Sequence, residues 1–258
     1  MPDPARPKKK LGQHFLKDPN TARIVASGVG PDDVVLEIGP GRGFLTRFLA
    51  ERANLVHAVE LDPDVLPALR DAVGDRGNVR IHVGDALRFD YASLDPAPNA
   101  LVANLPYNVA SPLVLMLLER VETLRTLRFM VQLEVARRMA AARGTKDYAS
   151  YAVLVGLLAE AKVLHKVPPT VFDPPPRVHS AVVEMSRKEP AKDYDRIKDV
   201  VLGAFRSRRK RLVNNLPEAA RAGAPRALIS LGLGPDARAE ELSPEDFAAL
   251  YRALSWAL

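Results

Sequence analysis

Polar or glycine residues stand directly after several apolar segments of this 258-residue chain. The segment VVLEI (34–38) runs into a glycine-rich stretch, EIGPGRG (37–43), that precedes a helical pattern, while Glu60 ends a second apolar run and Asp85 follows a third. Glycines let a ligand approach the backbone, a helix N-terminus offers free N–H groups, and a carboxylate at the end of a second strand can accept from both ribose hydroxyls of an adenosine. These positions predict one pocket for an adenosine-containing cofactor, lined by Gly39, Glu60 and Asp85.

The tetrapeptide Asn104-Leu105-Pro106-Tyr107 follows a fourth apolar segment and narrows the choice of cofactor. A glycine-rich turn alone is shared by nicotinamide, flavin and sulfonium-dependent enzymes. An amide oxygen and a neighbouring main-chain carbonyl can accept both hydrogens of an exocyclic amine, which turns the nitrogen lone pair towards an electrophile, and a tyrosine ring can stack on a flipped-out base. A plain turn with a core-facing tyrosine is the alternative explanation. Hydride transfer needs no such arrangement, so the tetrapeptide favours methyl transfer to an amine.

Alternating strand and helix patterns predict the framework that carries these residues. Buried strands are expected at residues 34–38, 55–60, 79–83, 100–104 and 127–133, with helices between them. Such alternation is typical of a parallel sheet covered by helices on both faces. After a helix at 148–160, the segments VLHKV (163–167) and VHSAVVEMS (178–186) predict an added antiparallel hairpin at the sheet edge.

The strand signals end at RKEPAKDYD (187–195), a polar stretch that contains a proline. Residues from about 194 to 258 have helical periodicity instead. We therefore expect two domains, an α/β domain at residues 1–187 and a small helical domain at residues 188–258.

The positive charge is concentrated in two segments. The chain holds 37 Lys plus Arg against 31 Asp plus Glu, a net charge of +6, yet residues 1–17 carry five basic groups and one acid, and residues 203–211 carry five basic groups and no acid. Focused charge suits a polyanion, although a solvated tail and a solvated helix face are the alternatives. The two segments together predict nucleic-acid contacts by Lys8, Lys9, Lys10, Arg206, Arg208, Arg209, Lys210 and Arg211.

The composition excludes several classes of protein. With no cysteine, disulfides, thiolate metal sites, cysteine-bound iron–sulfur clusters and cysteine nucleophiles are impossible. The longest apolar runs, 113–118 and 151–159, fall short of the roughly 18 residues that a membrane span needs. The basic N-terminal segment is not followed by the apolar stretch of a secretory signal. We expect a cytoplasmic protein with no metal site and no membrane partner.

Eight motifs follow one another along the chain. They are GQHFL (12–16), EIGPGRG (37–43), ELD (60–62), GDAL (84–87), NLPYN (104–108), VFDPPPRVHSAVV (171–183), AFRSRRKRLVNNL (204–216) and EELSPEDF (240–247). Together they resemble the ribosomal RNA adenine N6-dimethyltransferase family. The resemblance covers nearly the whole chain and is strongest to the bacterial small-subunit (16S) enzymes.

The resemblance implies a class I methyltransferase fold, Rossmann-like with a mostly parallel seven-stranded sheet, and a small all-α domain that binds RNA. It implies S-adenosylmethionine as cofactor and, as substrate, two adjacent adenosines in the 3′-terminal hairpin loop of 16S rRNA in the small ribosomal subunit or its precursor. A monomer is expected. Many family members have Asn in place of His14, and either side chain can donate a hydrogen bond. The expected cofactor contacts are His14, Leu16, Gly39, Gly41, Glu60, Asp85, Ala86 and Asn104.

The expected reaction is an in-line displacement at the adenine amine. Asn104 and the Leu105 carbonyl hold the amine, Pro106 fixes the loop, and Tyr107 and Phe172 sandwich the adenine ring. A DNA adenine or protein glutamine methyltransferase usually has Pro at the position of Leu105, which argues against both. Methylation of 23S rRNA and a mainly non-catalytic role in ribosome assembly or transcription are the remaining alternatives.

Overall fold

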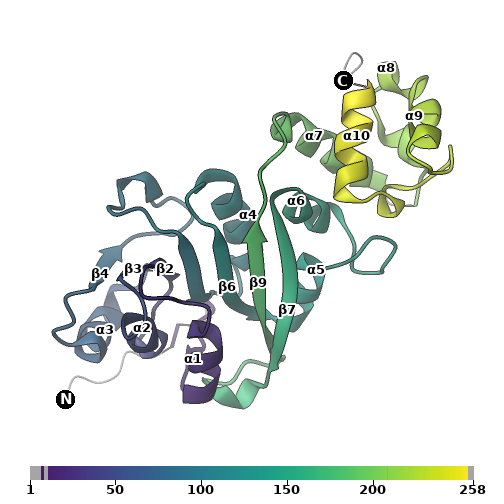
Figure 1. The fold of residues 1–258 in the computed structure, drawn as a ribbon. Helices are drawn as coiled ribbons and strands as arrows, with labels where there is room; N and C mark the ends of the chain where they lie inside the picture. Colours follow the sequence, from purple (N-terminus) through teal and green to yellow (C-terminus); the bar gives the residue numbers. More distant parts are fainter. Residues whose placement is uncertain (1–6, 9–10, 208, 255–258) are drawn as a thin grey trace. The chain divides into compact units, whose positions relative to one another are not determined.

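The computed structural model describes residues 7–8, 11–207 and 209–254. It divides into two compact units, the first made of residues 1–136 and 161–187 and the second of residues 137–160 and 188–258 (Figure 1). A boundary thus falls between residues 187 and 188, but the segment 137–160 belongs with the C-terminal helices rather than with the α/β unit. The division into folding domains at residue 187 stays a prediction.

The first unit is built on a seven-stranded sheet with the order β4-β3-β2-β5-β6-β9-β7 (Figure 1). The neighbouring pairs from β4 to β6 are parallel, and β9 runs antiparallel to β6. This arrangement confirms the predicted Rossmann-like fold with an antiparallel addition at one edge. The strands are β2 (Val34–Ile38), β3 (Leu55–Glu60), β4 (Val79–Val83), β5 (Ala100–Asn104), β6 (Thr126–Gln132), β7 (Ala159–Val167) and β9 (Ser180–Arg187).

The central strands are buried on both faces, as their uninterrupted apolar sequences require. Every residue of β2 and β3 is buried. The register aligns Ile38 with Val59 and Ala103 with Phe129. Because β2, β3, β4 and β5 run in one direction, the residues that follow their carboxyl ends meet at one edge of the sheet, where a ligand crevice forms in such folds.

Helices α1 (Pro19–Ala26) and α2 (Phe44–Ala50) pack on the sheet. Asp18 caps α1, since its carboxylate accepts from the Thr21 N–H at 2.7 Å. Val25 of α1 and Leu49 of α2 share one hydrophobic cluster with Val35 of β2. Further along the chain lie α3 (Leu66–Val73), α4 (Ala110–Arg120) and α5 (Leu133–Met139).

A two-stranded antiparallel sheet holds the N-terminal segment in place. It pairs β1 (Phe15–Leu16) with β8 (Phe172–Asp173), with Leu16 opposite Phe172. The Phe172 side chain is fully buried and belongs to the same hydrophobic cluster as Leu16 and Val25. Pairing between segments about 156 residues apart thus turns Phe172 into the core.

The second unit is helical in its described part. Tyr148 is buried, and its hydroxyl donates to the Leu242 carbonyl at 2.7 Å. An added Cβ on Gly156 would lie 2.6 Å from the Pro244 ring, so the close approach of these two residues requires a glycine at position 156. No helix in the described ranges is long and apolar enough to cross a membrane. The helices are α6 (Ser150–Leu158), α7 (Tyr194–Ala204), α8 (Glu218–Arg221), α9 (Ala224–Ser230) and α10 (Pro244–Leu254).

Candidate active site

One pocket lies at the carboxyl ends of β2, β3, β4 and β5. The loops after these strands and the N-terminal segment line it together. The structure therefore brings together every predicted cofactor residue and four of the five predicted catalytic residues. These are His14, Leu16, Gly39, Gly41, Glu60, Asp85, Ala86, Asn104, Leu105, Pro106 and Tyr107.

The glycine-rich turn has the backbone that only glycine adopts readily. Gly39 and Gly41 have φ angles of 67° and 56°, in the left-handed region that side chains other than glycine rarely enter. A Cβ on Gly41 would also lie 2.9 Å from the Phe15 ring. Within the turn, the Gly39 N–H donates to the Val59 carbonyl at 2.9 Å and the Gly43 N–H to the Pro40 carbonyl at 3.0 Å, so the turn has a fixed shape beside the N-terminus of α2.

Glu60 is held in a fixed orientation by two backbone donors. Its Oε2 accepts from the Gly41 N–H at 2.9 Å and its Oε1 from the Asp62 N–H at 2.8 Å. Glu60 is 5% exposed, and burial raises the pKa of its carboxyl group although these hydrogen bonds act in the opposite direction. A carboxylate has about four acceptor positions, more than these backbone donors occupy, so Glu60 can still accept from a ligand hydroxyl. The geometry fits a ribose held by two hydroxyls.

Glu37 is a functional candidate that the sequence interpretation missed. This residue of β2 lines the pocket and is 1% exposed, and although the Thr46 hydroxyl is its polar neighbour, Glu37 Oε2 and Thr46 Oγ1 both lack a hydrogen bond of normal geometry among the described residues. Burial raises its pKa to about 8. An unsatisfied acid beside a pocket suits a positively charged ligand, because a nearby cation would favour the ionised form. The available signal was a lone charge inside the apolar run VVLEI.

Asn104 presents an unused acceptor to the pocket. Its Nδ2 donates to the His14 carbonyl at 3.0 Å, which fixes the orientation of the amide. Its Oδ1 is buried and has no partner among the described residues. A buried acceptor without a partner is costly unless a ligand satisfies it. An amine donor at this position meets that need.

Tyr107 stands next to Asn104 with one face of its ring already covered. The His14 ring stacks on it with centroids 5.5 Å apart and an interplanar angle of 28°. The Tyr107 and Ser180 hydroxyls are hydrogen bonded at 2.5 Å, and burial raises the Tyr107 pKa to about 12. The Tyr107 hydroxyl is therefore un-ionised near neutral pH, and the residue presents a neutral aromatic ring to the pocket.

Phe172 does not lie with the other predicted catalytic residues. It does not line the pocket, and its side chain is fully buried in the core. The expected sandwich of Tyr107 and Phe172 is therefore not what the structure shows. The ring that stacks on Tyr107 is instead that of His14, a residue predicted to contact the cofactor.

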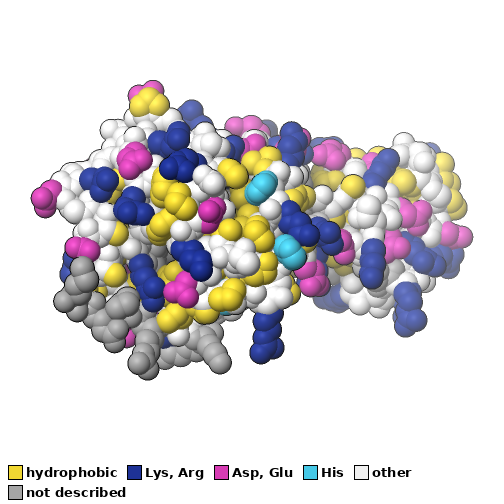
Figure 2. Space-filling model, turned by 90° about the horizontal axis from the view of Figure 1, so that it is seen from below, with side chains coloured by type: hydrophobic (Ala, Val, Ile, Leu, Met, Phe, Trp, Pro, Cys, Tyr) yellow, Lys and Arg dark blue, Asp and Glu magenta, His cyan; other side chains and the backbone are white. Residues whose placement is uncertain are grey.

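The predicted RNA contacts differ in their surroundings. The Lys8 ammonium forms ion pairs with Asp62 and Asp64, while Lys9, Lys10 and Arg208 lie outside the described residues. In the second unit, Arg206 and Lys210 line a groove, Arg209 is exposed, and Arg211 pairs with Asp236 at 2.5 Å. Figure 2 shows Lys and Arg side chains spread over the displayed face among Asp and Glu.

The sheet order, the glycine turn and the strand-end Glu60 and Asn104 define a class I methyltransferase domain. This chain belongs to the ribosomal RNA adenine dimethylase family, whose model matches residues 5–255. The predicted enzyme class, an S-adenosylmethionine-dependent adenine dimethyltransferase, is confirmed. No group of three or more potential metal ligands occurs in the part of the chain that the structure describes.

Named relatives and solved structures agree with this assignment. A ribosomal RNA small subunit methyltransferase A from Rubrobacter xylanophilus is 70% identical over 97% of this chain and 96% of its own, and one from Thiobacillus denitrificans is 41% identical over 95% and 96%. The 23S rRNA methyltransferase ErmE is similar at a TM-score of 0.76 and 29% identity, over 93% of this chain and 99% of its own. A dimethyladenosine transferase from Plasmodium falciparum shares the fold, with a TM-score of 0.80 at 24% identity over 95% and 98%.

Proposed function

We propose that this chain transfers methyl groups from S-adenosylmethionine to N6 of two adjacent adenosines in the 3′-terminal hairpin loop of 16S rRNA, giving N6,N6-dimethyladenosine. The observation that carries the proposal is the Asn104 amide, which has a fixed orientation and a buried, unpartnered Oδ1. The names of the 70% and 41% identical relatives support the small subunit as substrate. The reaction would take place in the cytosol during small-subunit biogenesis, with the chain acting as a monomer.

The residues that fit the cofactor are the glycine turn, Glu60 and Glu37. S-adenosylmethionine, when bound, supplies an electrophilic sulfonium methyl group. Glu60 accepts from the ribose hydroxyls with the oxygens that already hold Gly41 and Asp62. Glu37 offers a buried acid to the positive charge, and Asp85 and Ala86 lie at the pocket wall where the adenine of the cofactor is expected.

Asn104, the Leu105 carbonyl and Tyr107 prepare the nucleophile. The two carbonyl oxygens accept the hydrogens of the target amine, so that its lone pair points out of the conjugated ring. Tyr107 stacks on the flipped-out base. No general base is required, because the nitrogen becomes acidic only after it has been alkylated. Catalysis then depends on positioning and on removal of water from the reacting atoms.

The test is to supply unmethylated small subunits and, separately, unmethylated large subunits with labelled S-adenosylmethionine and to map the modified bases. We expect the label on two adjacent adenosines of 16S rRNA and none in 23S rRNA. Label in 23S rRNA would support the alternative substrate. Binding to small subunits without any transfer would support a non-catalytic role in assembly.

A further inference from the structure

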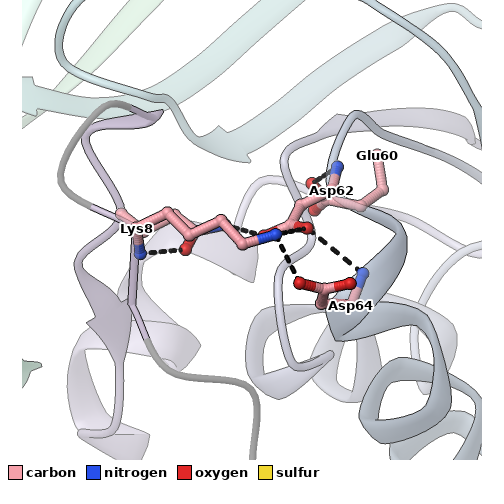
Figure 3. A network of polar contacts seen from close by, with 5 residues as sticks. Lys8, Glu60, Asp62 and Asp64 are labelled. Atoms are coloured by element: carbon pink, nitrogen blue, oxygen red, sulfur yellow. Dashed lines mark hydrogen bonds and ion pairs between the residues drawn. The ribbon is translucent and has the colours of Figure 1, made fainter.

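A set of hydrogen bonds ties the N-terminal segment to the acidic turn after β3 (Figure 3). The Lys8 ammonium lies 2.5 Å from Asp62 Oδ1 and 2.5 Å from Asp64 Oδ2. Gln13 Nε2 donates to the other Asp62 oxygen at 2.8 Å. The Lys8 N–H also donates to Gln13 Oε1 at 2.7 Å. Lys8 and residues 11–16, which the structure describes, are together called the strap from here on.

Asp62 is the buried centre of this network. Its side chain is 1% exposed, whereas that of Asp64 is 62% exposed. The Asp62 N–H donates to Glu60 Oε1 at 2.8 Å. One residue therefore joins the strap to the carboxylate expected to hold the ribose.

The far end of the strap reaches the methyl-acceptor side of the pocket. The His14 carbonyl accepts from Asn104 Nδ2 at 3.0 Å. Phe15 packs against the glycine turn, and the Arg42 guanidinium lies 4.3 Å from the Phe15 ring centroid. Pairing of β1 with β8 anchors this end. The strap therefore contacts both halves of the pocket.

Buried charges connect the strap to the residue expected to hold the ribose. Glu60 and Asp62 are buried carboxylates two residues apart, and Lys8 is the cation that contacts Asp62. A buried charge that loses its partner is strongly unfavourable. An uncompensated Asp62 would also disfavour ionisation of Glu60, since like charges raise each other's pKa.

We propose that Asp62 is a positioning residue that clasps the strap over the cofactor pocket through Lys8 and Gln13, and that opening of this clasp controls exchange of cofactor and product. The inference rests on the proposed function, because it takes the pocket ligands to be S-adenosylmethionine and S-adenosylhomocysteine. Lys8 then serves the pocket rather than the RNA phosphates.

The first test measures how fast S-adenosylhomocysteine leaves the full-length protein in stopped-flow displacement. Lys8→Met and Asp62→Asn should each raise the dissociation rate by about tenfold, as expected for loss of a charge-assisted contact. The double variant should be no faster than the faster single, because both substitutions remove one shared interaction. Lys8→Arg should restore slow release, and Asp75→Asn, at an exposed acid just after α3 and outside the network, is the matched control.

Unchanged release rates, or effects that multiply in the double variant, would overturn the clasp. So would a Lys8→Met protein that loses RNA affinity and salt dependence while its release rate stays normal. These results differ from failure of the proposed function, in which the unmodified protein would bind neither S-adenosylmethionine nor S-adenosylhomocysteine.

A second test observes the strap itself. The chain contains no cysteine, so Leu11→Cys places a single thiol on the strap. Thiol labelling should be about tenfold faster when Lys8→Met is added, because coupled opening exposes the strap as a unit. Added S-adenosylhomocysteine should slow labelling of the Leu11→Cys protein. Equal labelling rates with and without Lys8→Met would contradict the proposal, even if both variants fold normally.

Discussion

The cofactor pocket of the first unit and the basic segment 206–211 of the second unit differ in how far their charged side chains are buried. In the pocket, Glu37 and Glu60 are 1% and 5% exposed, and backbone groups hold Glu60 in place. In the basic segment, Arg211 and its partner Asp236 are 57% and 69% exposed. Recognition of one small ligand needs fixed geometry, whereas attraction to a phosphate backbone needs charge and tolerates motion. Substitutions in the two regions should therefore affect different measurements.

The largest effect is expected from Asn104→Ala. Loss of one preorganised group that acts on the reacting atoms costs about 10² to 10³ in rate, so single-turnover methyl transfer should fall by that factor while RNA affinity changes little. Rapid-quench assays on pre-formed RNA complexes measure the rate. Asn20→Ala, on the exposed start of α1, is the control. A normal single-turnover rate for Asn104→Ala would rule out the amine-holding role.

Glu37 should make stability depend on pH. Its pKa rises to about 8 on folding, from 4.5, so the folded protein keeps a proton that the unfolded chain releases. The stability that protonated Glu37 contributes to the folded protein is therefore complete below about pH 4.5 and is lost as the pH rises through 8. The free energy of unfolding of the unmodified protein should fall by about a few kcal/mol between pH 5 and pH 9 because of Glu37. Glu37→Gln should not show this fall, because glutamine does not titrate.

Urea unfolding of both proteins at several pH values measures the difference. If the unmodified protein and Glu37→Gln lose stability in parallel from pH 5 to pH 9, Glu37 is ionised throughout. That result would contradict the claim that Glu37 is protonated in the folded protein.

Glu60→Ala should weaken cofactor binding by about 1.5 to 3 kcal/mol, because it removes a charge-assisted acceptor for two hydroxyls. This corresponds to roughly a tenfold to hundredfold rise in Kd. Calorimetry with S-adenosylmethionine measures it, with Glu122→Ala at an exposed position as control. RNA affinity should barely change. Cofactor affinity equal to that of the unmodified protein would refute the ribose assignment.

Neutralising Arg208, Arg209 and Lys210 should weaken RNA binding and flatten its salt dependence. Each lost phosphate contact lowers the slope of log K against log salt by about 0.7 to 0.9. Cofactor affinity should stay unchanged. The measurement is a titration with rRNA at several salt concentrations.

The control removes an equal charge from α2, α3 and their flanks, by alanine at Arg52, Arg70 and Arg76. Its slope should change less than that of the first variant. Equal slopes for the two variants would show that net charge, rather than the basic segment, governs RNA binding.

Local sequence patterns predicted the strand-end residues because the topology of a parallel sheet follows from the alternation of strands and helices. Once VVLEI, LVHAVE and ALVAN are parallel neighbours, Gly39, Glu60 and Asn104 must share an edge. No contact between distant segments has to be known for this step.

The remaining features depend on contacts that no local pattern encodes. Phe172 is buried because β8 pairs with β1, and an aromatic residue before a proline run gives no sign of that partner. Lys8 meets Asp62 across 54 positions of sequence. Helix α6 is apolar on most sides, so its periodicity does not show that it packs with the C-terminal helices.

The most direct test of the account is a time course of modified nucleosides, measured by mass spectrometry during reaction with unmethylated small subunits and excess S-adenosylmethionine. In the proposed arrangement, an unmethylated adenine amine gives one hydrogen to Asn104 Oδ1 and one to the Leu105 carbonyl, whereas a monomethylated amine has one hydrogen left. Loss of one such bond, roughly 0.5 to 1.5 kcal/mol, should slow the second transfer by a few-fold to tenfold. We predict that N6-methyladenosine appears transiently and that N6,N6-dimethyladenosine accumulates. A reaction that stops at the monomethyl form would contradict the account.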